Sequence, residues 1–120
     1  MSKKLMKTMD GNEAAAYVSY ALTEVATIFP ITPSSPMPEH VDVWASHGMK
    51  NLFGQPVRVM EMQAEAGAIG ALHGVVEAGS LGTSYTASQG LMLMIPVMHR
   101  IAATCKPAVL HVAARSVGSH

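Results

Sequence analysis

The chain has 120 residues, of which 49% are hydrophobic and only 13% charged, and its formal net charge is zero. This balance gives no electrostatic case for binding nucleic acid or an anionic membrane, and the uncharged stretch 78–98 is too rich in glycine and hydroxyl side chains to span a bilayer. The length predicts one domain at most, and so little charge indicates that further protein covers much of its surface. A single cysteine excludes an internal disulfide and fits a reducing compartment, so we expect a cytoplasmic protein.

Helical and strand-like patterns alternate through the first half of the chain. Asp10 or Asn12 can cap a helix over residues 12–25, and the apolar run 26–32 predicts a short buried strand. A Thr-Pro pair at the end of that run is typical of a helix cap and first turn, which predicts a second helix over 33–46.

The alternation continues in the second half. Residues 57–62, 81–87 and 108–114 are predicted strands, and residues 65–78 and 89–103 are predicted helices, the second of them kinked by an internal proline. Strands separated by helices favour β-α-β crossovers, so the predicted fold class is α/β, a parallel sheet with helices on both faces. The chain stops directly after the last predicted strand, and we therefore expect a truncated domain.

In an open parallel sheet, ligands bind beyond the carboxyl ends of the strands, and four places in this sequence fall there: Thr32, Glu65, Ser88–Gln89 and Arg115. Thr32 lies between two prolines in a stiff corner whose backbone N–H groups suit a carboxylate, although a simple helix cap explains it as well. Arg115 follows an apolar strand, where a guanidinium can bind a carboxylate through two hydrogen bonds, although a surface arginine is the simpler interpretation.

Glu65 begins a predicted helix made almost wholly of small residues. An acid in a first helical turn usually does no more than complement the helix dipole. Apolar surroundings without a nearby basic residue, however, suit an acid that relays protons. Glu61, four residues earlier, is the rival for that role.

Small residues follow one face of the same predicted helix. Gly67, Gly70 and Gly74 lie on it, and each glycine inside a helix costs up to ~1 kcal/mol relative to alanine. Close approach of another helix or chain would explain that cost, and we favour an interface between chains over an internal contact.

The remaining candidate residues carry weaker signals. The histidines are scattered without metal-ligand spacing, and Cys105 has no CxxC partner with which to hold an iron–sulfur cluster. No glycine-rich phosphate loop of the common nucleotide-binding types is present. We therefore predict no metal ligand in these residues.

Four strings, in this order, carry a resemblance to a known family: DGNEAAAYVSYALTEVATIFPITPSSPMPE, EMQAEAGAIGALHG, TSYTASQGLMLMIPVM and HVAAR. Together they resemble the N-terminus of the pyruvate:ferredoxin (flavodoxin) oxidoreductases, and the likeness covers essentially all 120 residues. The PITPSS corner is similar across the 2-oxoacid:ferredoxin oxidoreductases, whereas GNEAAA and TASQGLMLMIP resemble the pyruvate branch.

The resemblance implies that residues 1–120 are an incomplete N-terminal thiamine-diphosphate domain of the pyrimidine-binding type. The whole enzyme would oxidatively decarboxylate pyruvate to acetyl-CoA and CO2 and pass the electrons to ferredoxin or flavodoxin. The resemblance also implies a long chain that works as a homodimer. Other domains would hold Mg²⁺ with the diphosphate, carry [4Fe–4S] clusters and bind coenzyme A, so the isolated piece is expected to be inactive.

The resemblance also implies residue roles. Glu65 matches the family glutamate that hydrogen-bonds the aminopyrimidine ring of the cofactor, and it is the expected catalytic residue. Thr32 and Arg115 match positions that contact the carboxylate and carbonyl of pyruvate, and Ser88 and Gln89 match a loop that lines the cofactor pocket. Two alternatives stay open: a related oxidoreductase for another 2-oxoacid, and a non-catalytic module that pairs through its glycine face.

Overall fold

The computed structural model describes residues 6–29, 31 and 34–114 of the chain. Its strands form one four-stranded parallel sheet in the order β2-β1-β3-β4. The elements in chain order are α1 (Gly11–Ala21), β1 (Val25–Ile28), α2 (Pro36–Ser46), β2 (Arg58–Glu61), α3 (Glu65–Glu77), β3 (Gly82–Ala87), α4 (Ser88–Thr104) and β4 (Val109–Ala113). The predicted α/β class, with a parallel sheet flanked by helices, is confirmed.

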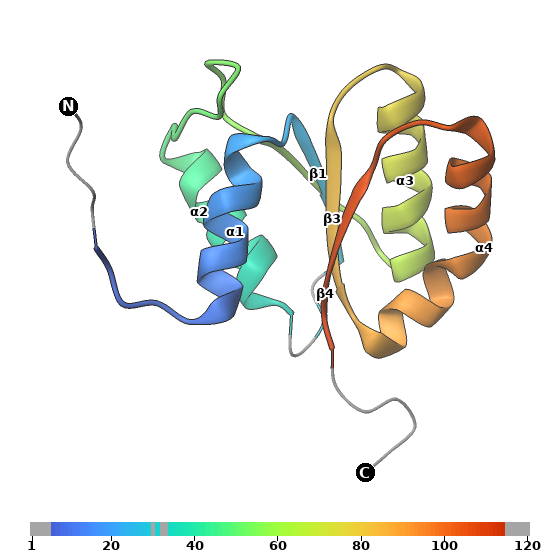
Figure 1. Cartoon of the computed structure of the whole chain (residues 1–120), viewed down its shortest axis with the longest axis horizontal. Coiled ribbons are helices and arrows are strands. Elements are labelled where there is room, and N and C mark those ends of the chain that lie inside the picture. The colour runs from blue at the N-terminus through green and yellow to red at the C-terminus, as the bar shows by residue number, and fades with distance from the viewer. Residues whose placement is uncertain (1–5, 30, 32–33, 115–120) are drawn as a thin grey trace, which may run out of the picture.

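Helices cover both faces of the sheet, α1 and α2 on one side and α3 and α4 on the other (Figure 1). Each side has its own apolar cluster, as expected for a parallel sheet that must be buried on both faces. The buried residues of the first cluster are Ala16, Tyr20, Ala26, Ile28, Met37, Val41, Val57 and Tyr85. Those of the second are Ala68, Ile69, Leu72, Val76, Met94 and Ile101.

In the part of the chain that the structure describes, no helix has the length and apolarity needed to cross a membrane.

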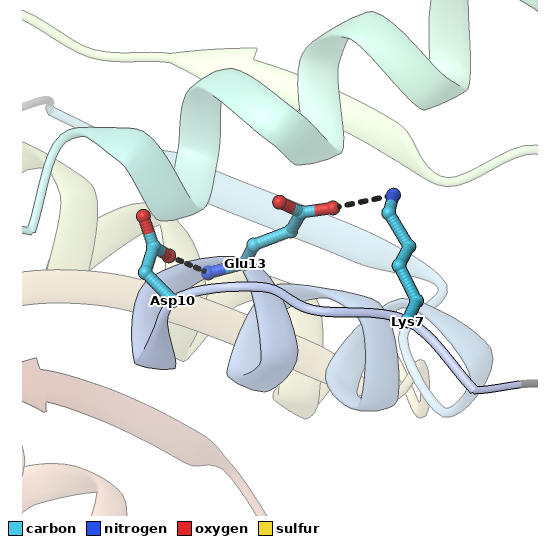
Figure 2. A network of polar contacts seen from close by, with 3 residues as sticks. All are labelled: Lys7, Asp10 and Glu13. Atoms are coloured by element: carbon cyan, nitrogen blue, oxygen red, sulfur yellow. Dashed lines mark hydrogen bonds and ion pairs between the residues drawn. The ribbon is translucent and has the colours of Figure 1, made fainter.

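A side-chain cap fixes the start of α1. The Asp10 carboxylate accepts a hydrogen bond of 2.8 Å from the backbone N–H of Glu13, and the Glu13 carboxylate lies 2.9 Å from the Lys7 ammonium (Figure 2). The cap is worth about 1 kcal/mol, whereas an ion pair on the surface contributes less. The prediction that this helix extends to residue 25 is wrong, because Val25 pairs in the sheet with strands on both sides.

The prediction for the start of α2 is also wrong. The helix begins at Pro36, after Ser35 as its N-cap, and not at residue 33. A proline at the first helical position costs the helix no hydrogen bond, because a backbone N–H there would have no partner within the helix. The segment contains two Ser/Thr-Pro pairs, Thr32-Pro33 and Ser35-Pro36, and the helix begins at the second pair. Thr32 is therefore not the cap of α2, and it lies outside the described residues.

The connection between β3 and α4 has no loop. All six residues of β3 are buried, and the helix starts at Ser88, directly after the last strand residue. Ser88 is thus the first helical residue, one position earlier than predicted, and Ala87 is the N-cap. Pro96 lies inside α4, and the helix changes direction partway along its length, as predicted (Figure 1).

Candidate functional site

The carboxyl ends of β1 and β3 mark the point where the chain changes direction across the sheet. From β1 the chain passes through α2 to β2 on one side, and from β3 it passes through α4 to β4 on the other. The two connecting helices lie on opposite faces (Figure 1). In open parallel sheets, such a switch point is where ligands bind.

Glu65 lies at this end of the sheet, as the first residue of α3. Its half-buried side chain packs against the first turn of α4: a Cβ atom built on Gly90 would lie 3.0 Å from Glu65 Cγ and 3.5 Å from its Oε2. The structure therefore brings Glu65 together with the segment that starts α4. In that segment Ser88 is buried and Gln89 half-buried.

A hydroxyl of the central strand holds the first turn of α3 in place. Thr27 on β1 is fully buried, and its Oγ1 donates a hydrogen bond of 2.8 Å to the carbonyl oxygen of Ala68. This bond ties β1 to the turn that carries Glu65. Because Glu65 stands in the first turn of its own helix and beside the first turn of α4, its side chain lies near the positive ends of two helix dipoles.

The rival acid occupies a different position. Glu61 is the last residue of β2, is exposed, and pairs in register with Ile28 of β1. It is Glu65, and not Glu61, that lies against Gly90. Of these two acids Glu65 is the less exposed, and its role as the proton-relaying acid stays a prediction.

Two predicted site residues, Thr32 and Arg115, lie outside the described residues. Along the chain, Thr32 belongs to the connection between β1 and α2, one of the two connections at the switch point. Arg115 follows the last residue of β4 by two positions. Their roles stay predictions.

Sequence reasoning missed three residues at the first turns of α3 and α4: Thr27, Thr86 and Gly90. The first two are threonines in strands, where β-branched residues are common, so nothing marked them. Gly90 did carry a signal, since a glycine inside a helix requires a reason.

Two of the three glycines of α3, Gly70 and Gly74, face open space among the described residues, whereas a Cβ on Gly67 would contact Met62. A Cβ built on Gly70 or Gly74 would meet nothing within 4 Å. Gly74 borders a groove of about 430 Å³ between α3 and β2. The internal-contact interpretation is therefore wrong for these two positions within the described chain, and the interface between chains stays a prediction.

A separate polar cluster lies on the α1 side of the sheet. Tyr85 Oη lies 2.7 Å from Ser19 Oγ, and the Tyr85 ring stacks on His111 with 5.2 Å between ring centroids. Burial raises the pKa of Tyr85 to about 12, partly opposed by the hydrogen bond with Ser19. Burial also lowers the pKa of His111. This cluster stands on the other face from Glu65, and we assign it to stability.

The shifted pKa of Tyr85 predicts a loss of stability at alkaline pH. The unfolded chain ionises this tyrosine near pH 10 and the folded chain only near its pKa of about 12. The stabilisation is therefore complete below pH 10 and is lost as pH rises towards 12, by about 2–3 kcal/mol in all.

The comparison of Tyr85→Phe with wild type in the complete polypeptide isolates this effect. Between pH 9 and about 11.5 the thermal unfolding midpoint of the wild type should fall more steeply than that of the variant. Tyr17→Phe is the matched control, because Tyr17 is 55% exposed. Parallel pH profiles for wild type and Tyr85→Phe would contradict the prediction.

The described ranges hold no group of three or more His, Cys, Asp and Glu side chains placed to bind a metal ion.

Comparison with known proteins identifies relatives over nearly the whole chain. The sequence model of the family described as "Pyruvate flavodoxin/ferredoxin oxidoreductase, thiamine diP-bdg" matches residues 17–120. The pyruvate-flavodoxin oxidoreductase of Klebsiella pneumoniae is 66% identical over 115 residues, which are 96% of this chain and 10% of the relative. The pyruvate:ferredoxin oxidoreductase of Moorella thermoacetica is 61% identical over 114 residues, 95% of this chain and again 10% of the relative. The chain thus spans about a tenth of the length of these relatives.

A solved structure shares the fold. It is a 2-oxoglutarate:ferredoxin oxidoreductase from Magnetococcus marinus with 2-oxoglutarate, coenzyme A and succinyl-CoA bound. It superposes with a TM-score of 0.79 over 92% of this chain and 18% of that one, at 20% sequence identity.

Proposed function

Because the chain belongs to the pyruvate flavodoxin/ferredoxin oxidoreductase family, we propose that it forms the aminopyrimidine-binding part of a thiamine-diphosphate enzyme. That enzyme oxidatively decarboxylates pyruvate to acetyl-CoA and CO2. The observation that carries the proposal is the half-buried Glu65 carboxyl at the switch point of the sheet, in a chain whose family is described as thiamine-diphosphate-binding. Residues 1–120 are then the incomplete N-terminal pyrimidine-type domain of a longer polypeptide.

The residues at the switch point fit this cofactor. An aminopyrimidine ring is flat, with apolar faces and a polar edge, and one of its two ring nitrogens needs a carboxyl partner with which to share a proton. Glu65 offers that carboxyl, and Gly90 beside it adds no side chain that would fill the space. Glu65 would hold the ring, and Ser88 and Gln89 would line the same pocket from the first turn of α4. When bound, the cofactor supplies an electron sink for the carbon that loses CO2.

The protein side chains then have distinct tasks. Glu65 holds or moves the proton at the ring nitrogen, as a general acid–base group. Thr32 and Arg115 bind pyruvate: the guanidinium pairs with its carboxylate, and the threonine hydroxyl and nearby N–H groups contact the carboxylate and carbonyl. The roles of these two residues rest on their chemistry and on their positions in the sequence.

The rest of the polypeptide would supply what this part lacks. We propose that it holds Mg²⁺ and the diphosphate, carries [4Fe–4S] clusters for electron transport, and contributes to the coenzyme A site. The electrons would pass to ferredoxin or flavodoxin. We further propose a homodimer and a cytoplasmic location. The open groove beside the glycine face of α3 is consistent with pairing there, and the single, exposed cysteine fits a reducing compartment.

Pyruvate is favoured over other 2-oxoacids because the relatives at 61–66% identity are named for it. The test is an anaerobic assay of the complete polypeptide with thiamine diphosphate, Mg²⁺ and coenzyme A, in which reduction of ferredoxin, flavodoxin or a low-potential dye is followed. We expect kcat/KM for pyruvate to exceed that for 2-oxoglutarate or a branched-chain 2-oxoacid by about 100-fold. Preference for another 2-oxoacid would contradict the assignment of pyruvate as substrate. Full activity without thiamine diphosphate would contradict the proposed function.

A further inference from the structure

Gly90 stands in the first turn of α4, is buried, and has no backbone reason to be glycine. The glycines with positive φ among the described residues are Gly48, Gly54 and Gly79, and Gly90 is not one of them. An alanine there would lower the intrinsic cost of the helix by about 1 kcal/mol. The absence of a side chain at this position must therefore be explained by what surrounds it.

The surroundings of Gly90 are Glu65 and Thr86. A Cβ at residue 90 would lie 3.0 Å from Glu65 Cγ, closer than side chains normally approach, and it would overlap Thr86 Oγ1. By contrast, a Cβ on Gly67 would make only an ordinary contact at 3.6 Å, and one on Gly70 would meet nothing within 4 Å. Of the glycines in α3 and α4, Gly90 alone leaves room for the Glu65 side chain.

We propose that Gly90 is a positioning residue, whose missing side chain sets where the Glu65 carboxyl lies. This inference rests on the proposed function, because it acts through Glu65 and not through contact with substrate or cofactor. A methyl group at residue 90 forces the Glu65 side chain to move by a few tenths of an ångström. Because the catalytic effect of a positioned group depends steeply on its geometry, a small shift lowers the rate without removing the acid.

Gly90→Ala alone does not separate this effect from packing, since it also forces the buried Thr86 side chain to move. The double variant Thr86→Ala/Gly90→Ala removes that second overlap and keeps the one with Glu65. Thr86→Ala is its reference. Gly11→Ala is the matched control for a helix glycine, because a Cβ at residue 11 meets nothing within 4 Å.

The experiment uses the complete polypeptide and three readouts. These are kcat and KM for pyruvate, the affinity for thiamine diphosphate by calorimetry, and hydrogen–deuterium exchange at the thiazolium carbon of the bound cofactor without pyruvate. We expect the double variant to unfold at the same temperature as Thr86→Ala, while its exchange rate and kcat fall about ten-fold and KM stays unchanged. We expect Gly11→Ala to behave as the wild type.

Two results would overturn the proposal: equal exchange rates and kcat in the double variant and Thr86→Ala, or a double variant that fails to fold where Thr86→Ala folds. The second would show that Gly90 serves packing alone. Glu65→Gln in the same series distinguishes failure of the positioning role of Gly90 from failure of the proposed function. If Glu65→Gln loses turnover and the double variant does not, the positioning role fails and the proposed function stands. If Glu65→Gln retains full turnover, the assignment of Glu65 fails and the positioning role with it.

Discussion

In the complete polypeptide, Glu65→Gln is expected to lower kcat for pyruvate oxidation by about 10²–10⁴-fold, the usual contribution of a general acid–base group. The amide keeps the shape of the side chain but cannot hold or release the proton at the cofactor ring. Because pyruvate does not contact this residue in the proposed site, its KM should change little. Such a split, with kcat lost and KM kept, is typical of an interaction needed in the transition state.

Glu61→Gln is the matched control for this prediction. Glu61 is the same residue type, lies four positions earlier, and is exposed at the end of β2. Steady-state kinetics of both variants should show loss of turnover only at position 65. Full activity of Glu65→Gln, or an equal loss in Glu61→Gln, would contradict the assignment of the acid.

Arg115→Ala is expected to lower kcat/KM for pyruvate by about 100-fold, mainly through KM. A bidentate pair between a guanidinium and a carboxylate provides two charge-assisted hydrogen bonds, each worth about 1.5–3 kcal/mol, and part of that is regained from water. Thiamine-diphosphate affinity should stay unchanged, because the residue contacts the substrate and not the cofactor in the proposed site.

Arg100→Ala controls for the loss of one positive charge, because Arg100 is exposed on α4. Kinetics over a range of pyruvate concentrations, together with calorimetry of the cofactor, check the prediction. A fall in cofactor affinity in Arg115→Ala, or a similar rise in KM in Arg100→Ala, would show that Arg115 does not bind pyruvate specifically.

Most of the fold could be predicted from the sequence, because strand and helix patterns alternate clearly along it. Strand β3 and helix α3 each lie within one residue of their predicted bounds. The error at the end of α1 arose where a local signal conflicts with pairing in the sheet. Val25 fits the helical period of the preceding residues, yet it pairs with strands on both sides. Such pairings depend on residues more than thirty positions away, so the sequence near Val25 does not indicate them.

The candidate site was predictable only in part, for a related reason. The start of α3 and the rule that ligands bind at carboxyl strand ends made Glu65 a candidate, with Glu61 as its rival. The residues near it come from other elements: Gly90 and Thr86 from the junction of β3 with α4, and Thr27 of β1, which bonds the first turn of α3. Neither composition nor periodicity reports which residues meet across elements, so these contacts had to come from the structure.

The most direct test of the account is the distance between the Glu65 carboxylate and the aminopyrimidine ring, in an experimental structure of the complete polypeptide with thiamine diphosphate bound. We predict a hydrogen bond of about 2.6–3.2 Å between a Glu65 carboxylate oxygen and a ring nitrogen, with Gly90 in contact with the Glu65 side chain. A different acid at that nitrogen, or a cofactor bound away from the carboxyl ends of β1 and β3, would contradict it.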